Sequence, residues 1–283
     1  PQPNEGEKGL APGFGRVYLS GFDNRIIKFA KNSFDLSQTT LEGRSTINPN
    51  GGIDFVTFEG GVDTNNLNVE RYEPIMLATA CYYYFTIAEP QVCIDPDPYS
   101  TITQKKVCEV GDTTLSSQGA PIAITKIVEE ALATKTQFRI TVKNVGGGEV
   151  IKASASAGTE AMDKCNPFGT TKLGREDIDK VFLQEVKLGI QTLQCGPFAD
   201  QSGAKGTHGF IRLINGEGSV ICELSKNDYG QTNSAYTTPL KIKVSYVYKN
   251  TAERKVLIKK ETGGLSESSI PKTKSEPPAS GFD

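Results

Sequence analysis

The stretch "KTQFRITVKNV", residues 135–145, decides the fold class. Its apolar residues Phe138, Ile140 and Val142 alternate with polar residues along the whole stretch. Because successive side chains of a β-strand point to opposite faces, one face of this segment would be apolar and the other polar. Such alternation is typical of an antiparallel strand with one buried face.

Stretches on both sides of this segment also predict β-strands. The preceding "APIAITKIVEEAL" is joined to it by "ATK", and "GFIRLI" is joined to "SVICELS" by "NGEG", which is a strong hairpin signal. "KVFLQEVKLG" and "IQTLQC" predict another hairpin, and "LKIKVSYVYKN" predicts a further alternating strand. Short strands separated by turns predict an all-β protein built around an antiparallel, immunoglobulin-like (Ig-like) β-sandwich.

The chain divides into four expected parts. Residues 1–15 would be an extended N-terminal arm, and residues 262–283 a Ser/Pro-rich tail. Between them we expect a β-rich domain with a disulfide loop at 16–117 and the Ig-like sandwich at 118–261. Within these domains, "IDFVTFEG" at 53–60 reads as a strand, and the acidic start of "GREDIDKVFLQEV" suggests one helical turn at Glu176–Lys180.

Composition argues against several functions. A net charge of −2 provides no basic field for nucleic acid. The most apolar run, Ile75–Ala88, is too short to cross a bilayer as a helix, so we expect no membrane segment within this chain. The single histidine, His208, lies in a Gly-rich loop without a nucleophile motif, and no phosphate-binding loop is present. We therefore expect no enzyme, although a hydrolase with spatially assembled carboxylates stays a third alternative.

The six cysteines lack a Cys-x-x-Cys pair, which argues against zinc or thioredoxin-type chemistry. An even count fits three disulfides and an oxidising compartment, and the alternative is six buried free thiols. We expect a Cys93–Cys108 bond, whose loop of about 15 residues contributes about 3 kcal/mol in the chain-entropy model. The remaining expected pairs are Cys195–Cys222 and Cys81–Cys165.

Two polar clusters are weak calcium candidates: Asp63 with Asn65, and Asp95 with Asp97. The alternative is that Asp-Pro and Asn-rich segments form turns. No other cofactor is expected.

Four residues are interface candidates. In a strand, Tyr82 and Tyr84 point to one face, while Tyr83 points to the other. Either this strand is central and buried on both sides, or one aromatic face is an intersubunit contact. Val17 and Leu19 also alternate near the N-terminal arm, which could add to the sheet of a neighbouring subunit.

The motif "ITVKNVGGGEV", residues 140–150, resembles the archaeal and bacterial secreted adhesion-type Ig-like β-sandwich modules. More loosely, "LATACYYY", "VCIDPDPYST" and "ICEL" together resemble uncharacterised secreted proteins of small-genome archaea. The resemblance implies an archaeal-type, secreted or cell-surface assembly unit and adds no catalytic residues.

We therefore expect an extracellular structural protein, a homo-oligomeric subunit of a surface layer, filament or adhesin. Its partners would be other copies of itself or other surface proteins, not nucleic acid. The alternative is a secreted module that binds a carbohydrate or a cell-surface receptor.

Overall fold

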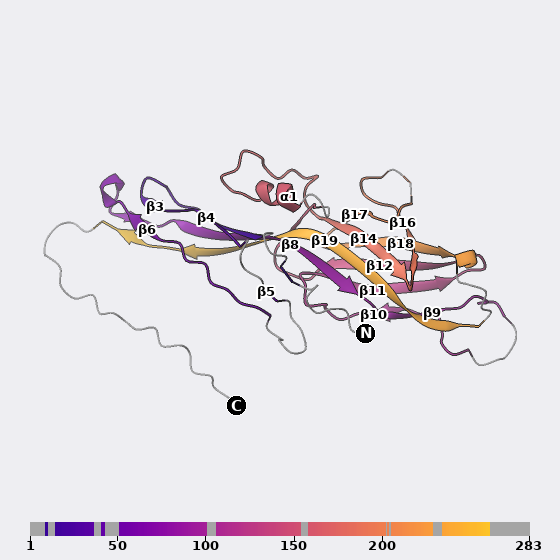
Figure 1. Cartoon of the computed structure of the whole chain (residues 1–283). Helices are drawn as coiled ribbons and strands as arrows, with labels where there is room; N and C mark the ends of the chain where they lie inside the picture. Colours follow the sequence, from indigo (N-terminus) through magenta and orange to yellow (C-terminus); the bar gives the residue numbers. More distant parts are fainter. Residues whose placement is uncertain are drawn as a thin grey trace, which may run out of the picture.

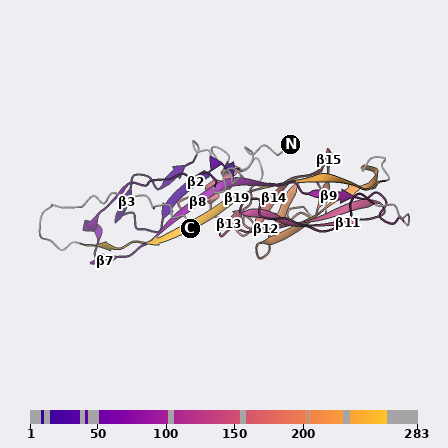
Figure 2. The same ribbon diagram turned by 90° about the horizontal axis from the view of Figure 1, so that it is seen from below.

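The computed structural model describes residues 9–10, 15–36, 41–42, 51–100, 106–153, 158–201, 203, 205–228 and 234–260. Within them the protein is all-β and elongated, with several antiparallel sheets (Figures 1 and 2). The expected arm (1–15) and tail (262–283) lie outside the described residues, apart from Gly9–Leu10 and Gly15. No helix of the described part is long and apolar enough to span a membrane.

The first sheet of the sandwich has five strands in the order β10-β11-β12-β18-β16. Its hairpin β11–β12 is the one predicted from the alternating stretch, with Glu129 opposite Phe138. The strands are β10 (Thr113–Thr114), β11 (Ile122–Ala131), β12 (Lys135–Asn144), β16 (Gln194–Gly196) and β18 (Glu217–Ser225).

The second sheet has nine strands, with the order β15-β14-β19-β8-β2-β4 along its main path. In addition, β9 and β13 pair with β19, and β17 pairs with β14. The strands are β2 (Gly15–Ser20), β4 (Ser33–Asp35), β8 (Ile75–Ala88), β9 (Gln91–Ile94), β13 (Glu149–Ile151), β14 (Lys180–Leu188), β15 (Gln191–Thr192), β17 (Gly209–Arg212) and β19 (Tyr236–Lys255).

Three strand pairs and three short helices complete the described structure. The pairs are β1 (Gly9–Leu10) with β5 (Leu41–Glu42), β3 (Ile27–Phe29) with β6 (Gly60–Val62), and β7 (Arg71–Tyr72) with β20 (Ile258–Lys259). The helices are α1 (Gly158–Lys164) and the 3₁₀ turns η2 (Thr64–Asn66) and η3 (Lys226–Asp228).

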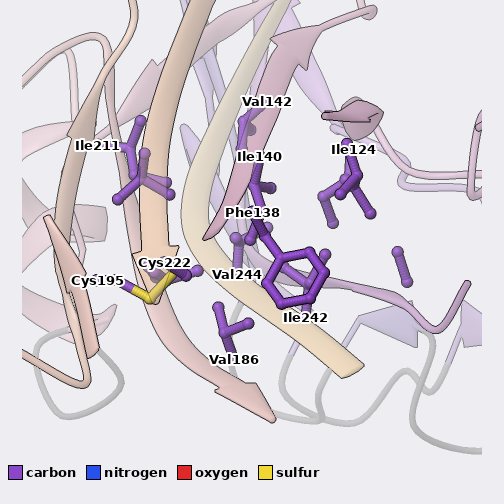
Figure 3. Close-up of a cluster of buried hydrophobic side chains, with 14 of the residues drawn as sticks. Ile124, Phe138, Ile140, Val142, Val186, Cys195, Ile211, Cys222, Ile242 and Val244 are labelled. Atoms are coloured by element: carbon purple, nitrogen blue, oxygen red, sulfur yellow. A yellow bond between two sulfur atoms is a disulfide. The ribbon is translucent and has the colours of Figure 1, made fainter. Parts of the chain in front are cut away.

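The core lies between the two large sheets. Phe138, Ile140 and Val142 of β12 are fully buried, as their alternation predicts, and they pack with Val186 of β14 and Val244 of β19 (Figure 3). Burying one such side chain stabilises the fold by about 1.5–3 kcal/mol. This packing of two apolar faces holds the sandwich together.

The sandwich core crosses the boundary that the sequence suggests between residues 117 and 118. Val92 and Ile94 of β9 belong to the same buried cluster as Phe138. Moreover, β8 pairs with β19 along its whole length, from Ala88 opposite Ile242 to Ile75 opposite Lys255. The expected domains at 16–117 and 118–261 therefore share one sheet and one core.

Two local expectations were wrong. The helical turn expected at Glu176–Lys180 is a hydrogen-bonded turn at residues 175–177 instead. The strand β14 begins at Lys180, as the hairpin prediction requires, and Val181, Leu183 and Val186 face the core. The segment at 53–60 is no strand before Gly60, and Ile53 and Phe55 are 73% and 87% exposed.

The turn predicted at "NGEG" exists, but it does not close a hairpin within one sheet. Asn215 and Gly216 have φ values of 53° and 78°, which a glycine adopts without strain, and Ile214 and Glu217 exchange backbone hydrogen bonds. However, β17 pairs with β14 in the nine-stranded sheet, whereas β18 pairs with β12. The chain therefore passes from one sheet to the other at this turn.

Candidate functional site

The strands β8 and β19 extend beyond the sandwich. In this extension, side chains on one face of the large sheet are accessible to solvent. Val17 of β2 lies opposite Ala80 of β8, and Leu19 lies opposite Ala78. Directly opposed residues of neighbouring strands point to the same face, so these side chains form one surface. This surface, the apolar sheet face, consists of Val17, Leu19, Phe34, Met76, Ala78, Ala80 and Ala252. Two polar residues of β19, Asn250 and Arg254, lie on it opposite Ala80 and Met76.

The apolar sheet face is partly open to solvent. Phe34 is 42% exposed, Ala78 and Ala252 are also exposed, and the other members are half-buried. Nearer the sandwich, Ala88 of the same strand belongs to the buried core. Along β8 this face therefore changes from buried at Ala88 to exposed at Ala78.

The opposite face of the same strands is covered where α1 packs on it. There, Tyr18, Cys81 and Val247 form a buried cluster with Met162 and Cys165 of α1 and its C-terminal end. The Cys81–Cys165 disulfide joins β8 to the end of this helix. The opposite face is thus apolar where α1 packs, whereas further along β19 it carries the exposed residues Thr251, Glu253 and Lys255.

The four interface candidates do not share one environment. Val17 and Leu19 lie on the apolar sheet face, within a strand that already pairs on both sides with β4 and β8. The backbone of β2 is thus occupied within its own chain, so strand addition to a neighbour through Val17 and Leu19 is not supported.

The two tyrosines belong to the edge of the sandwich core. Tyr82 lies beside Tyr84 and Tyr248, with ring centroids 6.1 and 5.9 Å away, and burial raises its pKa to about 12. Tyr84 packs on Tyr246, with ring centroids 6.2 Å apart. Both rings therefore pack against the core, and Tyr82 borders the apolar sheet face through its neighbour Gly15 on β2.

All six cysteines are in disulfides: Cys81–Cys165, Cys93–Cys108 and Cys195–Cys222. These are the three pairs named from the sequence. Cys195 and Cys222 lie directly opposite each other on the neighbouring strands β16 and β18. Full oxidation is the state that proteins reach in oxidising compartments.

The side chains of the calcium candidates make contacts with lysines and backbone groups instead. Asp63 accepts hydrogen bonds from Lys28 at 2.9 Å and from the N–H of Asn65 at 3.2 Å, and the lysine contact lowers the pKa of this carboxyl. Asp95 pairs with Lys106, whose ammonium also donates to the carbonyl of Asp97. Among the described residues, no three acidic, histidine or cysteine side chains gather as metal ligands.

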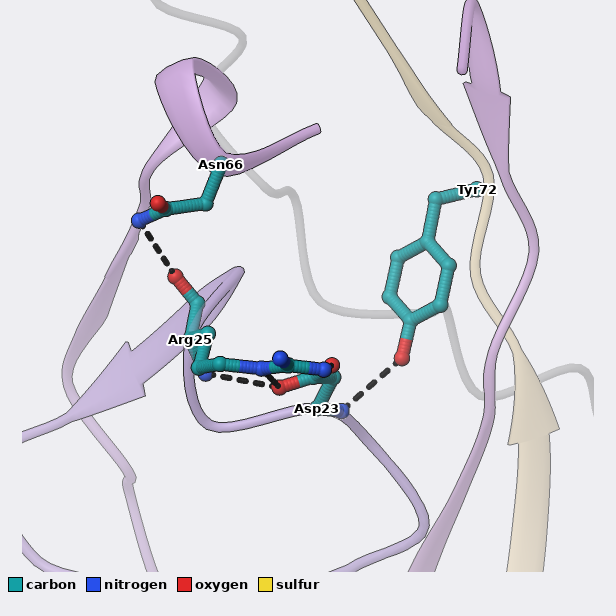
Figure 4. Close-up of polar contacts among 4 residues, drawn as sticks. All are labelled: Asp23, Arg25, Asn66 and Tyr72. Atoms are coloured by element: carbon teal, nitrogen blue, oxygen red, sulfur yellow. Dashed lines mark hydrogen bonds and ion pairs between the residues drawn. The ribbon is translucent and has the colours of Figure 1, made fainter. Parts of the chain in front are cut away.

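A polar network orders the end of the molecule farthest from the sandwich (Figure 4). Arg25 donates to the Asp23 carboxylate at 2.7 Å and lowers the pKa of that carboxyl to about 2. The N–H of Asp23 donates to the Tyr72 hydroxyl, and Asn66 donates to the Arg25 carbonyl. These contacts tie the turn after β2 to η2 and β7.

A hollow of about 350 Å³ opens on the outer face of the large sheet, and sequence reasoning missed it. It is lined by Phe182, Gln184, Glu185, His208 and Lys243. The Phe182 and His208 rings are 6.0 Å apart, and Gln184 donates to the Tyr83 hydroxyl at 3.2 Å. These residues come from β14, β19 and a loop, so no spacing in the sequence could reveal the hollow.

The hollow is lined by one lysine, Lys243, and one acidic residue, Glu185. The Lys243 ammonium lies 4.9 Å from the centre of the Phe85 ring. Glu185 pairs with Lys187 at 2.6 Å, and this contact, with burial opposing it, lowers the pKa of the carboxyl. The hollow can thus offer an aromatic ring, an amide and an ammonium group to a bound molecule.

The chain matches no family model, no curated protein and no solved structure.

Proposed function

We propose that this chain is an extracellular structural protein, a subunit of a surface layer, filament or adhesin that acts through protein–protein contacts rather than catalysis. The observation that carries the proposal is the apolar sheet face, with Phe34, Ala78 and Ala252 accessible on a broad, regular sheet. Exposed contiguous apolar surface on a folded protein commonly marks an interaction site.

Other features support a location outside the cell. Three disulfides link segments that are up to 84 residues apart, and such bonds persist in oxidising surroundings. We also propose Ig-like strand connections for the sandwich, which its two facing antiparallel sheets support. Other copies of the chain are the proposed partners, because a net charge of −2 opposes their approach only weakly.

The double substitution Phe34→Glu and Ala252→Glu tests the proposal. Placing two carboxylates on the apolar sheet face should prevent association, because burying unpaired charges in an interface is strongly unfavourable. Concentrated full-length protein would be followed by analytical ultracentrifugation and electron microscopy.

Ile190→Glu is the matched control, since Ile190 is 93% exposed and lies in the turn between β14 and β15. The wild type and this control should form oligomers or fibres, while the double variant stays monomeric and folded. A wild type that remains monomeric at high concentration, or equal loss of assembly in the control, would contradict the proposal.

The hollow at Phe182 favours a second candidate, a secreted module that binds an acidic carbohydrate. The Phe182 ring could pack on the C–H face of a sugar, and Lys243 could pair with its carboxylate, while Gln184 binds a hydroxyl.

Calorimetry with a glucuronic acid-containing oligosaccharide tests this candidate. Phe182→Ala and Lys243→Met should each weaken binding about tenfold, equivalent to about 1.4 kcal/mol. Phe168→Ala, at a ring that is 49% exposed outside the hollow, serves as the control. Absence of heat with the wild type would exclude this ligand, and equal weakening in the control would place binding elsewhere.

A further inference from the structure

Glu129 is a buried carboxyl group at the core side of β11. Only 7% of the residue is exposed, whereas the next residue, Glu130, is exposed on the other side of the strand. Phe138 lies opposite it on β12, and Ile127 precedes it on the same face. An acidic side chain thus occupies a position where this strand otherwise places apolar residues.

The carboxyl group connects the two sheets. Its Oε2 accepts a hydrogen bond from the N–H of Cys93 at 3.2 Å. Cys93 lies on β9, which pairs with the first residues of β19, Cys93 being opposite Thr237. Glu129 therefore links β11 of the five-stranded sheet to the strand that carries the Cys93–Cys108 disulfide.

The second oxygen of this carboxyl group, Oε1, is buried and has no hydrogen-bond partner. A buried polar atom without a partner is unfavourable, and an ionised carboxylate in the same place is far more so. The neutral carboxylic acid is the less unfavourable form there, because it buries no charge and its Oε2 still accepts from Cys93.

Among the residues that the structure describes, no charged group pairs with this carboxyl. Asp95, two residues beyond Cys93, is paired with Lys106, and Tyr236 lies opposite Ile94 with a pKa that burial raises. On β11 itself, Lys126 pairs with Asp112 at the surface. Burial raises the pKa of Glu129 to about 7, and the Cys93 N–H, which favours the charged form, opposes this only in part.

We propose that Glu129 is a pH-sensitive switch, which holds β9 and its disulfide loop against β11 when neutral and releases them when ionised. On ionisation the proton passes to solvent, and β9 separates so that water can reach the carboxylate. Opening also uncovers Val92 and Ile94 of β9, which belong to the buried core, whereas the contacts among β12, β14 and β19 remain.

The direction with pH follows from the raised pKa in the closed state. In the open state Glu129 has an ordinary pKa, 4.5, against about 7 when closed. The closed state is therefore fully favoured below pH 4.5. It loses stability as pH rises through about 7, where the loss levels off, because both states are then ionised.

Reduction of the disulfides by a water-soluble phosphine tests the switch. Full-length protein at pH 5, 6, 7 and 8 would receive a short pulse of reductant, followed by alkylation and peptide mapping. Cys195–Cys222, which is fully buried, is the internal reference that cancels the pH dependence of the reagent. Reduction of Cys93–Cys108 relative to this reference should rise by up to about tenfold per pH unit up to about pH 7 and then level off.

Glu129→Gln should abolish this rise, because the amide keeps the size and the acceptor but cannot ionise. Glu130→Gln, at the exposed neighbour, should retain it. A flat profile in the wild type would overturn the proposal even if the Glu129 variant does not fold. An unchanged rise in folded Glu129→Gln would overturn it as well.

Discussion

Tyr246 shows at the scale of single residues how this core accommodates polar atoms. The residue is fully buried, yet its hydroxyl lies 3.0 Å from that of Thr86 and accepts from the N–H of Ile122 at 3.4 Å. Thr86 in turn donates to the Ile122 carbonyl at 2.7 Å. Burial raises the pKa of this tyrosine well above its ordinary value, so the phenol stays neutral. The hydrogen bonds among these three residues thus join β8, β19 and β11.

Tyr246→Phe should lower the free energy of unfolding by about 1 to 3 kcal/mol, because the Ile122 N–H and the Thr86 hydroxyl lose a partner in a buried place. Urea unfolding measures this change. Tyr99→Phe, at a residue that is 66% exposed, should have no measurable effect. Equal stability of the two variants would show that the buried hydroxyls contribute nothing net.

At the scale of elements, α1 depends on the sheet beneath it. A helix of seven residues is marginal by itself, because nucleation is unfavourable and few hydrogen bonds follow. Ala161 and Met162 pack in the cluster of Tyr18 and Val247, and Lys164 donates to Asp177 at 2.8 Å. The Cys81–Cys165 bond adds a covalent link across 84 residues.

Removal of this bond should destabilise the protein more than removal of the Cys93–Cys108 bond, which spans 15 residues. In the chain-entropy model the longer loop restricts the unfolded chain more, by about 1.5 kcal/mol. Urea unfolding of the two double Cys→Ala variants measures the difference. If the variant without Cys93–Cys108 is the less stable one, native contacts rather than loop length dominate.

At the scale of the whole molecule, β8 and β19 organise the shape. They pair over 14 residues of β8, and only part of this length lies within the sandwich (Figure 1). At the far end, a small cluster of Ile26, Ile27, Leu67 and Ile258 holds the remaining strands. An elongated sheet with one covered and one accessible face is a suitable unit for repeated lateral contacts, which the assembly experiment above examines.

The sequence by itself determined the all-β class, the central hairpin and the inward residues of β12. Alternation at Phe138, Ile140 and Val142 suffices for this, because side-chain direction in a strand follows directly from residue order. The three cysteine pairs could be named as well, and Val17 and Leu19 could be selected as apolar alternating residues. Apart from the cysteine pairs, these features are local. Six cysteines allow fifteen pairings, and the fold decides which of them form.

Only the tertiary structure decided which strands pair and which faces are covered. Backbone hydrogen bonds are the same for every residue, so nothing in "ACYYYF" identifies β19 as its partner strand. Tyr84, for example, lies opposite Tyr246, which is 162 positions later in the sequence (246 − 84). The same reason explains why Glu176–Lys180 is no helical turn, since the bridge between Ile178 and Ile151 and the burial of Lys180 depend on distant segments. The exposure of Phe34 and the burial of Glu129 depend on where one sheet covers the other. That arrangement results from packing between distant segments, so no single segment of the sequence reveals it.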